Sequence, residues 1–545
     1  MAPLLTASGY EFAPEERPTF PGSPAIPRLS LSHRVRYATV GFVLAASTTF
    51  GNALLNVNVA TIAGDMGWYV SEASWLPAIY VAMNASANLT LVKARTQFGI
   101  PVVTLGLLLL YALAAVWQFI LPGFASAAAI RAICGASAAA LATLTIYYLL
   151  QAFPGRLRPL ALVVGMGLIQ LGTPLARLIP LEVLAVHHWL GLYAIEGALA
   201  CLLLTLIITV PLPPSERSAA FEPADLLSIA LLVPAYLLLC GVLGEGRLLW
   251  WTDTIWLGEC LMGAVVLIAV AVSIEKHRAR PLLQLDWIGT RDILRFALVA
   301  LFMRVALAEQ TYAAVGLLTS GGLTNDQLHT LFAIVVAAMV CGVICAALTL
   351  SERRIPYQVA TAALLIAAAA WFDSDVTNLT RPEQLYVSQA MLGFGTTLFV
   401  GPALVFGFIR MFSRGATHLV TFVVLFSTTQ NVGGLAGSAL LGTYQTIATH
   451  SHTLALAEST KFDDPQVISR VQAGAAAIQG VVTDSSQRAG QSVGILGQAM
   501  AREASILAYQ DVFRLVALAG VSIALYVVGV SLFMRWHRRT TPGAP

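Results

Sequence analysis

Five ionisable side chains stand inside long apolar stretches of the sequence: Arg131, Arg177, Glu196, Arg304 and Glu309. A charged group is costly in a hydrocarbon environment, so each is a candidate functional residue if these stretches cross a membrane. At 1.5 Å of rise per helical residue, Arg131 and Glu196 are expected about 9 and 10 Å from the outer ends of their stretches. Arg304 is expected near the middle of its stretch, Glu309 in the outer half and Arg177 towards the outer end. Groups of opposite sign at overlapping depth can pair if their helices surround one cavity, and pairing lowers the cost of burial.

A carboxylate in such a cavity is suited to proton transfer. Removal from water favours its protonated form and a nearby guanidinium favours its ionised form, so a local rearrangement can load or release a proton. Glu309 and Glu196 are the candidates for this role. The alternative for each is a static ion pair or an interfacial side chain. Arg304 and Glu309 are five positions apart and do not share a helix face, so their partners are expected on other helices.

Composition identifies the solvent that surrounds these residues. Of the 545 residues, 57% are hydrophobic and 11% are charged, and the mean hydropathy is +0.77. Soluble domains carry roughly a quarter charged residues. The apolar residues fall into runs of about twenty, the length of a helix that crosses a bilayer. The sequence therefore predicts an all-α membrane protein embedded in a lipid bilayer, with no nucleic-acid partner.

The apolar runs predict about fourteen transmembrane helices. Lys and Arg gather in alternate short loops, which places those loops and both termini in the cytoplasm. The long connection 446–510 then lies outside and is expected to form two helices, one starting at Asp464-Pro465 and the other following a break near 480–486. It is either a lid over the outer mouth or a docking surface for a periplasmic partner. The expected spans are 37–62, 74–92, 100–121, 125–151, 158–181, 189–211, 224–243, 253–273, 293–317, 327–350, 357–372, 384–411, 416–445 and 511–534.

Several motifs are similar to those of a known family. Asn56 opens a stretch to Gly64 that resembles the end of a first helix, and Arg131-x-x-x-Gly135 matches a fourth-helix motif. The stretch from Gln430 to Gly437 is similar to Arg-x-x-Gly-Gly-x-x-Gly, with Gln430 in place of Arg. In order and spacing, these motifs resemble the fourteen-helix drug:proton antiporters of the major facilitator superfamily, the EmrB/QacA-like group, of which this chain would be a divergent member.

The resemblance implies two six-helix bundles with an extra helix pair between them. The implied domains are a disordered cytoplasmic tail (1–36), an N-terminal six-helix bundle (37–211), an extra transmembrane pair with linkers (212–290), C-terminal bundle helices (291–445), a periplasmic helical segment (446–510), and a last transmembrane helix with a cytoplasmic tail (511–545). The substrate cavity is expected between the bundles near the midplane.

Three departures from the family pattern change the expected site. Gly51 stands where the family often has a first-helix Asp, Arg177 stands where it has a small residue, and 92–99 departs from the expected loop motif. In the family, the Arg at the position of Arg131 is implicated in proton transfer. If coupling survives without the first-helix Asp, it must use other carboxylates, which again favours Glu196 and Glu309.

The function expected from this resemblance is secondary active transport rather than catalysis. The chain would export amphiphilic or aromatic small molecules across a bacterial inner membrane, with organic anions favoured by its basic residues. It would use the proton gradient and no cofactor, because no Gly-rich phosphate loop or metal site stands out. A periplasmic adaptor and an outer-membrane channel are the implied partners, and an uncoupled or inward-directed carrier is the alternative. The candidate coupling and substrate residues are Glu309, Glu196, Arg131, Arg304, Arg177, Asn56 and Gln430.

Overall fold

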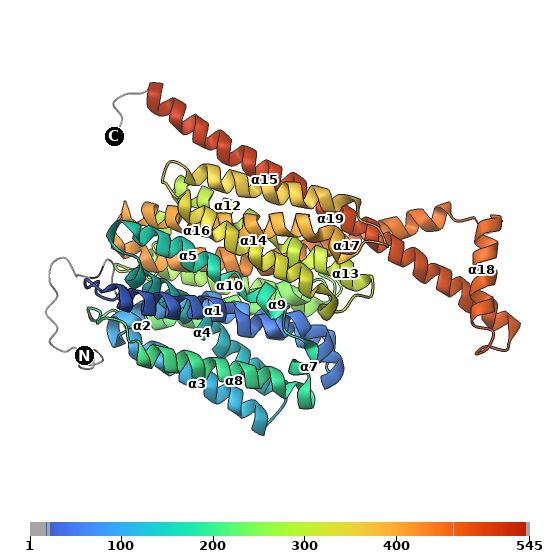
Figure 1. The fold of residues 1–545 in the computed structure, drawn as a ribbon, viewed down its shortest axis with the longest axis horizontal. Helices are drawn as coiled ribbons and strands as arrows, with labels where there is room; N and C mark the ends of the chain where they lie inside the picture. The colour runs from blue at the N-terminus through green and yellow to red at the C-terminus, as the bar shows by residue number, and fades with distance from the viewer. Residues whose placement is uncertain (1–17, 19–21, 462, 541–545) are drawn as a thin grey trace.

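The computed structural model describes residues 18, 22–461 and 463–540, and these form an all-helical bundle (Figure 1). In the described part of the chain, the only extended pairing is an isolated bridge between Pro24 and Ser215. The N-terminal helices are α1 (Leu31–Met66), α2 (Val70–Phe98), α3 (Ile100–Ile120), α4 (Phe124–Ala152), α5 (Arg158–Ile169), the short α6 (Gly172–Ala176) and α7 (Leu181–Leu184), and α8 (Val186–Thr209).

The remaining helices divide into a linking pair and a C-terminal set. The linking pair is α9 (Pro223–Glu245) and α10 (Ile255–Lys276), followed by the short α11 (Leu285–Ile288). The C-terminal set is α12 (Arg291–Glu309), a π-helical turn (Gln310–Ala314), α13 (Val315–Ser320), α14 (His329–Leu348), α15 (Ile355–Phe372), α16 (Tyr386–Phe412), α17 (Leu419–Ser459), α18 (Pro465–Ala477) and α19 (Ser485–Thr540).

Twelve helices in the described residues are long and apolar enough to cross a membrane. Two of the fourteen expected spans are absent from this set, namely α2 and the continuous stretch α12–α13. Both carry several charged or amide side chains, which lower their hydropathy. Both nevertheless lie alongside the apolar helices in the bundle (Figure 1), so the expected number of about fourteen is compatible with the fold.

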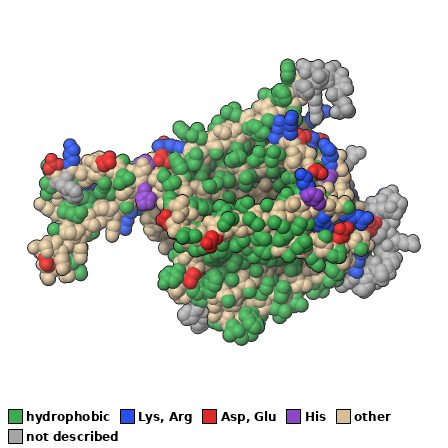
Figure 2. All heavy atoms as spheres, turned by 180° about the vertical axis from the view of Figure 1, so that it is seen from behind, with side chains coloured by type: hydrophobic (Ala, Val, Ile, Leu, Met, Phe, Trp, Pro, Cys, Tyr) green, Lys and Arg blue, Asp and Glu red, His purple; other side chains and the backbone are tan. Residues whose placement is uncertain are grey.

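The bundle has two distinguishable ends. α1 begins and α19 finishes at one end, called here the termini end, and α18 lies at the other, called the α18 end (Figure 1). Hydrophobic side chains cover the broad face of the bundle, and Lys and Arg gather towards the termini end (Figure 2). This is the surface expected of a protein whose middle contacts acyl chains.

Glycines permit the closest helix contacts in the bundle. A Cβ atom on Gly437 of α17 would lie 2.8 Å from the side chain of Ala308 and 2.9 Å from the Cα of Val305, both on α12. A Cβ atom on Gly401 of α16 would lie 2.8 Å from the Cα of Val163 on α5. The first contact lies within the C-terminal set and the second joins it to the N-terminal helices. Small residues at these positions therefore set the spacing both within and between the bundles.

Several expected boundaries differ from the structure. α1 begins at Leu31 rather than 37, and Ala25 is fully buried, with its amide donating to the carbonyl of Pro214 at 2.8 Å. The disordered tail expected over 1–36 is thus wrong for 22–36, and residues 1–17 and 19–21 lie outside the described part. The Pro and polar residues of 1–36 suggested disorder, but the bridge between Pro24 and Ser215 and the hydrogen bond to Pro214 hold 22–30 against the 211–215 linker.

The long connection is also built differently from the expectation. α17 continues to Ser459 and α19 starts at Ser485, so 446–510 is not separate from the spans that flank it. Its Ala, Leu and Gln residues favour helix, which explains the continuity. The expected start at Asp464-Pro465 is confirmed, since α18 begins at Pro465 and the Asp464 carboxylate accepts from the Gln466 amide at 2.8 Å. We call residues 446–510 the α18 hairpin.

Candidate functional site

A cavity lies between the N-terminal and C-terminal helices and encloses an empty volume of about 1110 Å³, part of it open to solvent. Its walls come from α1, α2, α4 and α5 on one side and from α12, α16 and α17 on the other. The polar lining includes Asn84, Asn88 and Arg95 of α2, Arg304 of α12 and Gln430 of α17. This is the expected place for a transport site, between two bundles that move against each other.

Amide side chains connect the two bundles across this cavity. The Nδ2 of Asn431 on α17 donates to the Oδ1 of Asn84 on α2 at 3.0 Å. The Nδ2 of Asn88 donates to the Oγ of Ser427 at 3.0 Å. Both asparagines of α2 lie within the second predicted span, 74–92, and both line the cavity.

Two of the predicted site residues, Arg304 and Gln430, contact each other. The Nε of Arg304 donates to the backbone carbonyl of Gln430 at 2.9 Å. A Cβ atom on Gly434 would lie 3.1 Å from this Nε, so the paired glycines of the motif leave room for the guanidinium. Both polar atoms of the Gln430 side-chain amide are buried without a hydrogen-bond partner. That amide is therefore available to a ligand in the cavity.

Arg95 is a cavity residue that was not predicted from the sequence. It was assigned with Lys93 to a loop, but α2 continues to Phe98 and leaves Arg95 only 3% exposed. Its guanidinium lies over the ring of Tyr147 at 5.6 Å, and its Nη1 is buried without a partner. Residues 92–99 depart from the family loop motif, and this departure could have indicated that Arg95 has a different role. The cavity lining thus contains two arginines, with no Asp or Glu among its residues.

Arg131 and Glu196 form a buried ion pair between α4 and α8, and both side chains are 0% exposed. A Cβ atom on Gly51 of α1 would lie 2.7 Å from the Oη of Tyr111 and 3.8 Å from the Oε1 of Glu196. The carboxylate of Glu196 therefore stands beside the place where the family often has its first-helix Asp. Neither member of the pair lines the cavity.

Glu309 lies in a separate cluster inside the C-terminal set. The Nε2 of Gln389 on α16 donates to the Oε1 of Glu309 at 3.1 Å and to the Oδ2 of Asp373 at 2.9 Å. The Oε1 of Gln389 accepts from the Nε2 of Gln310 at 3.3 Å. Glu309 and Asp373 are 0% and 2% exposed, and within the described residues neither makes an ion pair with Lys or Arg. We call Glu309, Asp373 and Gln389 the carboxylate cluster.

The carboxylate cluster has two features that the sequence did not predict. Asp373 follows the end of the eleventh expected span, where an acidic residue is normally interpreted as lying at the membrane surface. Its position directly after Trp371-Phe372 was the feature of the sequence that could have indicated a buried site. A π-helical turn begins at Gln310, immediately after Glu309. Such turns frequently occur at functional sites.

Arg177 and Asn56 lie away from the cavity. Arg177 donates through Nη1 to the Oδ1 of Asn325 at 3.2 Å, and the Nδ2 of Asn325 donates to the Arg177 carbonyl at 3.1 Å. The Arg177 guanidinium also lies over the ring of Phe332 on α14 at 5.0 Å. These contacts join the two bundles beside the α18 end. Asn56 is exposed on α1 and does not join the other predicted residues.

Comparison with known proteins gives the same fold. The family profile described as Major Facilitator Superfamily matches residues 41–438. A bacterial homologue of the human drug peptide transporters PepT1 and PepT2 has a similar structure, with a TM-score of 0.55, 11% identity, and coverage of 93% of this chain and 100% of that one.

Two further solved structures resemble the chain. One, from a study of substrate recognition in proton dependent oligopeptide transporters, has a TM-score of 0.57 and 11% identity and covers 92% of this chain and 99% of that one. The proton:xylose symporter XylE has a TM-score of 0.51 and 13% identity and covers 89% and 95%. No curated protein sequence matches the chain. At these identities the structural likeness shows the fold alone.

Proposed function

The chain belongs to the Major Facilitator Superfamily, and we propose that within it this protein is a proton-coupled exporter of amphiphilic or aromatic small molecules, with organic anions preferred. Members of this family are membrane transporters, not enzymes. The narrower kinship with fourteen-helix drug:proton antiporters is part of the proposal and rests on the sequence motifs.

The observation that carries the substrate class is the charge of the central cavity. Arg95 and Arg304 are its only ionisable side chains among the described lining residues, apart from the Tyr147 phenol. Phe408, Phe422 and other rings of α16 and α17 supply flat apolar surface. An aromatic or aliphatic carboxylate fits this lining, because guanidinium groups bind carboxylates and the apolar surface accommodates the rest of the molecule. A cationic dye would meet two like charges.

The carboxylate cluster supports proton coupling. Two carboxylates on the same amide group, away from water and without a cation, repel each other when both are ionised. Uptake of a proton removes this repulsion, so the cluster is suited to load and release one. Glu196 ranks second as a proton carrier. Arg131 already balances its charge, so Glu196 could take up a proton only if that ion pair opened.

The orientation and the partners are further parts of the proposal. Both termini would lie in the cytoplasm of a bacterial cell, and the α18 hairpin would extend from the inner membrane into the periplasm. There it would bind a periplasmic adaptor that leads to an outer-membrane channel. Shortening the hairpin should then abolish co-purification with the adaptor and leave transport-site binding intact; unchanged co-purification would contradict this assignment.

The alternative is an uncoupled or inward-directed carrier, and the absence of a first-helix carboxylate at Gly51 favours it. Proton flux in proteoliposomes distinguishes the two functions. Aromatic carboxylates and cationic dyes would each be added to wild type, Glu309→Gln, Asp373→Asn and Glu196→Gln. Glu259→Gln is the matched control, because Glu259 also lies on a spanning helix but is exposed.

We expect organic anions to trigger outward substrate movement with proton counterflow in wild type and in the Glu259 control. Glu309→Gln and Asp373→Asn should abolish the proton counterflow. Substrate movement without proton flux in wild type would refute coupling. Tight binding of cationic dyes together with indifference to organic anions would refute the substrate class.

A further inference from the structure

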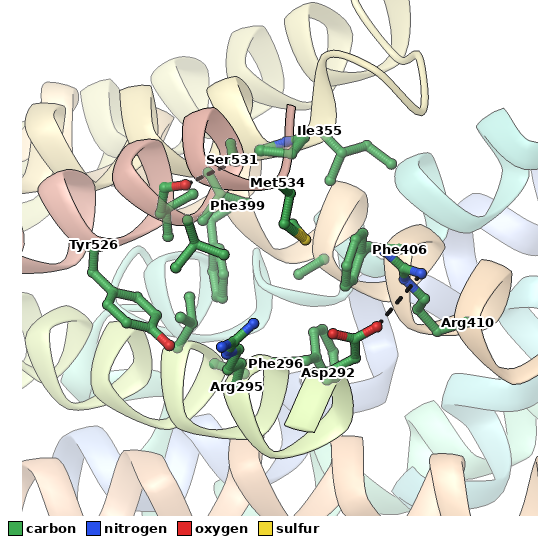
Figure 3. Close-up of a pocket in the computed structure, with 17 residues that line it drawn as sticks. Asp292, Arg295, Phe296, Ile355, Phe399, Phe406, Arg410, Tyr526, Ser531 and Met534 are labelled. Atoms are coloured by element: carbon green, nitrogen blue, oxygen red, sulfur yellow. Dashed lines mark hydrogen bonds and ion pairs between the residues drawn. The ribbon is translucent and has the colours of Figure 1, made fainter. Parts of the chain in front are cut away.

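A second pocket lies outside the central cavity, between α12, α15, α16 and α19 (Figure 3). Its lining includes residues from the start of α12, the end of α16 and the part of α19 that approaches the termini end (Figure 1). It contains an empty volume of about 740 Å³, part of it open to the outside of the protein. Most of its lining is apolar and includes Phe296, Phe399, Phe406, Val530 and Met534. A pocket of this composition can accommodate a hydrocarbon chain.

Charged groups stand at one side of this pocket. Arg295 and Asp292 come from the first turns of α12, and Arg410 comes from the last turn of α16 (Figure 3). Arg410 lies 3.7 Å from the carboxylate of Asp292 and 5.2 Å from the centre of the Phe406 ring. Arg295 is exposed and has neither a hydrogen bond nor an ion pair among the described residues. The three charges sum to one positive charge, and the unpaired group is a guanidinium.

The outer surfaces beside the pocket are apolar and uncovered. Leu298 and Phe302 of α12 are 43% and 56% exposed, and Leu525 and Phe533 of α19 are 68% and 62% exposed. In a membrane-spanning protein such surfaces contact acyl chains. Tyr526, which lines the pocket, is itself 46% exposed. The pocket therefore adjoins the lipid on the side between α12 and α19.

An aromatic wall separates this pocket from the central cavity. Phe296 lines the pocket, whereas Phe422 and Phe426 line the cavity. The ring of Phe296 lies 6.3 Å from that of Phe422 and 6.4 Å from that of Phe426, measured between ring centres. A Cβ atom on Gly407 would lie 2.1 Å from the Phe422 ring, so this glycine makes room for the wall. A ligand in the pocket would thus be distinct from one in the transport cavity.

We propose that this pocket binds one anionic phospholipid from the leaflet at the termini end. An acyl chain would occupy the apolar part, and the phosphate would contact Arg295 and Arg410. Basic residues at the surface of a bilayer attract anionic headgroups. A lipid fits better than a transported solute, because the pocket adjoins the bilayer and the aromatic wall closes it from the cavity. This inference does not depend on the proposed transport function.

Native mass spectrometry of the purified, full-length protein tests this proposal. The probes are dioleoylphosphatidylglycerol and dioleoylphosphatidylcholine, which share their acyl chains and differ in headgroup charge. We expect preferential binding of one phosphatidylglycerol. Arg295→Gln should weaken it about fivefold, which corresponds to about 1 kcal/mol for one basic residue at a membrane surface. Arg291→Gln is the matched control, since Arg291 is exposed one turn earlier on α12 and does not line the pocket.

A second variant tests the acyl-chain part independently of charge. Val530→Trp places a large ring in the pocket and should weaken binding of the phosphatidylglycerol, whereas the headgroup arginines stay intact. Equal binding of both lipids by wild type would overturn the proposal. So would an equal loss in Arg291→Gln and Arg295→Gln, or unchanged binding in Val530→Trp. Displacement of the lipid by a lower concentration of free oleate would assign the pocket to single-chain amphiphiles instead, and would also overturn it.

Discussion

Separating the buried pair Arg131–Glu196 should be among the most destabilising single changes in the bundle. Glu196→Gln leaves a guanidinium that is 0% exposed and whose Nε and Nη1 already have no hydrogen-bond partner. Removing one member of a buried pair typically costs about 3–5 kcal/mol, because the other charge stays in the interior uncompensated. We expect a loss near the lower end of this range, since the amide oxygen of Gln can still accept one hydrogen bond.

A double-mutant cycle measures the interaction itself. Arg131→Met combined with Glu196→Leu removes both charges, and such replacements are often neutral or stabilising. The free energy of unfolding, from reversible detergent titration of the four proteins, should show that the double variant is more stable than either single variant. The coupling energy should be about 3 kcal/mol or more.

The same cycle distinguishes a structural pair from a coupling pair. Single variants within about 1 kcal/mol of wild type, with additive effects, would refute the buried ion pair. A double variant that folds and retains full proton-coupled transport would show that the pair only stabilises the N-terminal bundle. In that case proton coupling would rest on the carboxylate cluster alone.

Three further substitutions test a contact between the bundles, a close packing of two helices and a titrating residue between α16 and α17. Asn325→Ala removes both hydrogen bonds to Arg177, each worth about 0.5–1.5 kcal/mol. The population in which the two bundles are separated at the α18 end should therefore rise about fivefold or more, as measured by distances between spin labels on the bundles. An unchanged distance distribution would contradict a role of these hydrogen bonds in holding the bundles together. Gly437→Val should destabilise the protein by about 1–3 kcal/mol through the close contact with α12. Gly106→Ala, with nothing within 4 Å of its Cβ, should not lower the melting temperature, because Ala favours helix over Gly. Burial and a neighbouring guanidinium lower the pKa of His418. The contribution of this residue to stability is therefore present above about pH 6.5 and is lost as the pH falls through the lower folded-state pKa. His418→Gln should flatten the dependence of the melting temperature on pH in this range, and an unaltered slope would contradict this contribution.

The sequence predicted the fold class and much of the site because apolar length and charge depth are local properties. Arg131 and Glu196 were expected at similar depth, and they pair. Arg304 and Glu309 were expected to find partners on other helices, and they do, on α17 and α16 respectively. Their membership of the transport site itself stays a prediction.

Other relationships depend on helix rotation and packing, which periodicity in a helix that is apolar on all sides does not determine. Arg177 was grouped with Arg131 and Arg304 because of its charge, but it lies directly after the end of α6 and contacts Asn325 instead. Arg95 was read as a loop residue because charges normally mark the end of a span. Asp373 was overlooked for the same reason. An acidic residue at a helix end is normally taken to be exposed to water, and only the packing of the neighbouring helices shows that it is buried.

The length of α19 has a mechanical consequence. Its 56 residues form one uninterrupted helix, which at 1.5 Å per residue is about 84 Å long, against a hydrocarbon core of about 30 Å. One stretch of this rod belongs to the α18 hairpin, and another lines the pocket beside Arg295. A helix of this length can curve gently, but it contains no loop at which its two parts could move independently. We therefore expect a load applied to the hairpin to reach the termini end as a tilt or rotation of the whole helix.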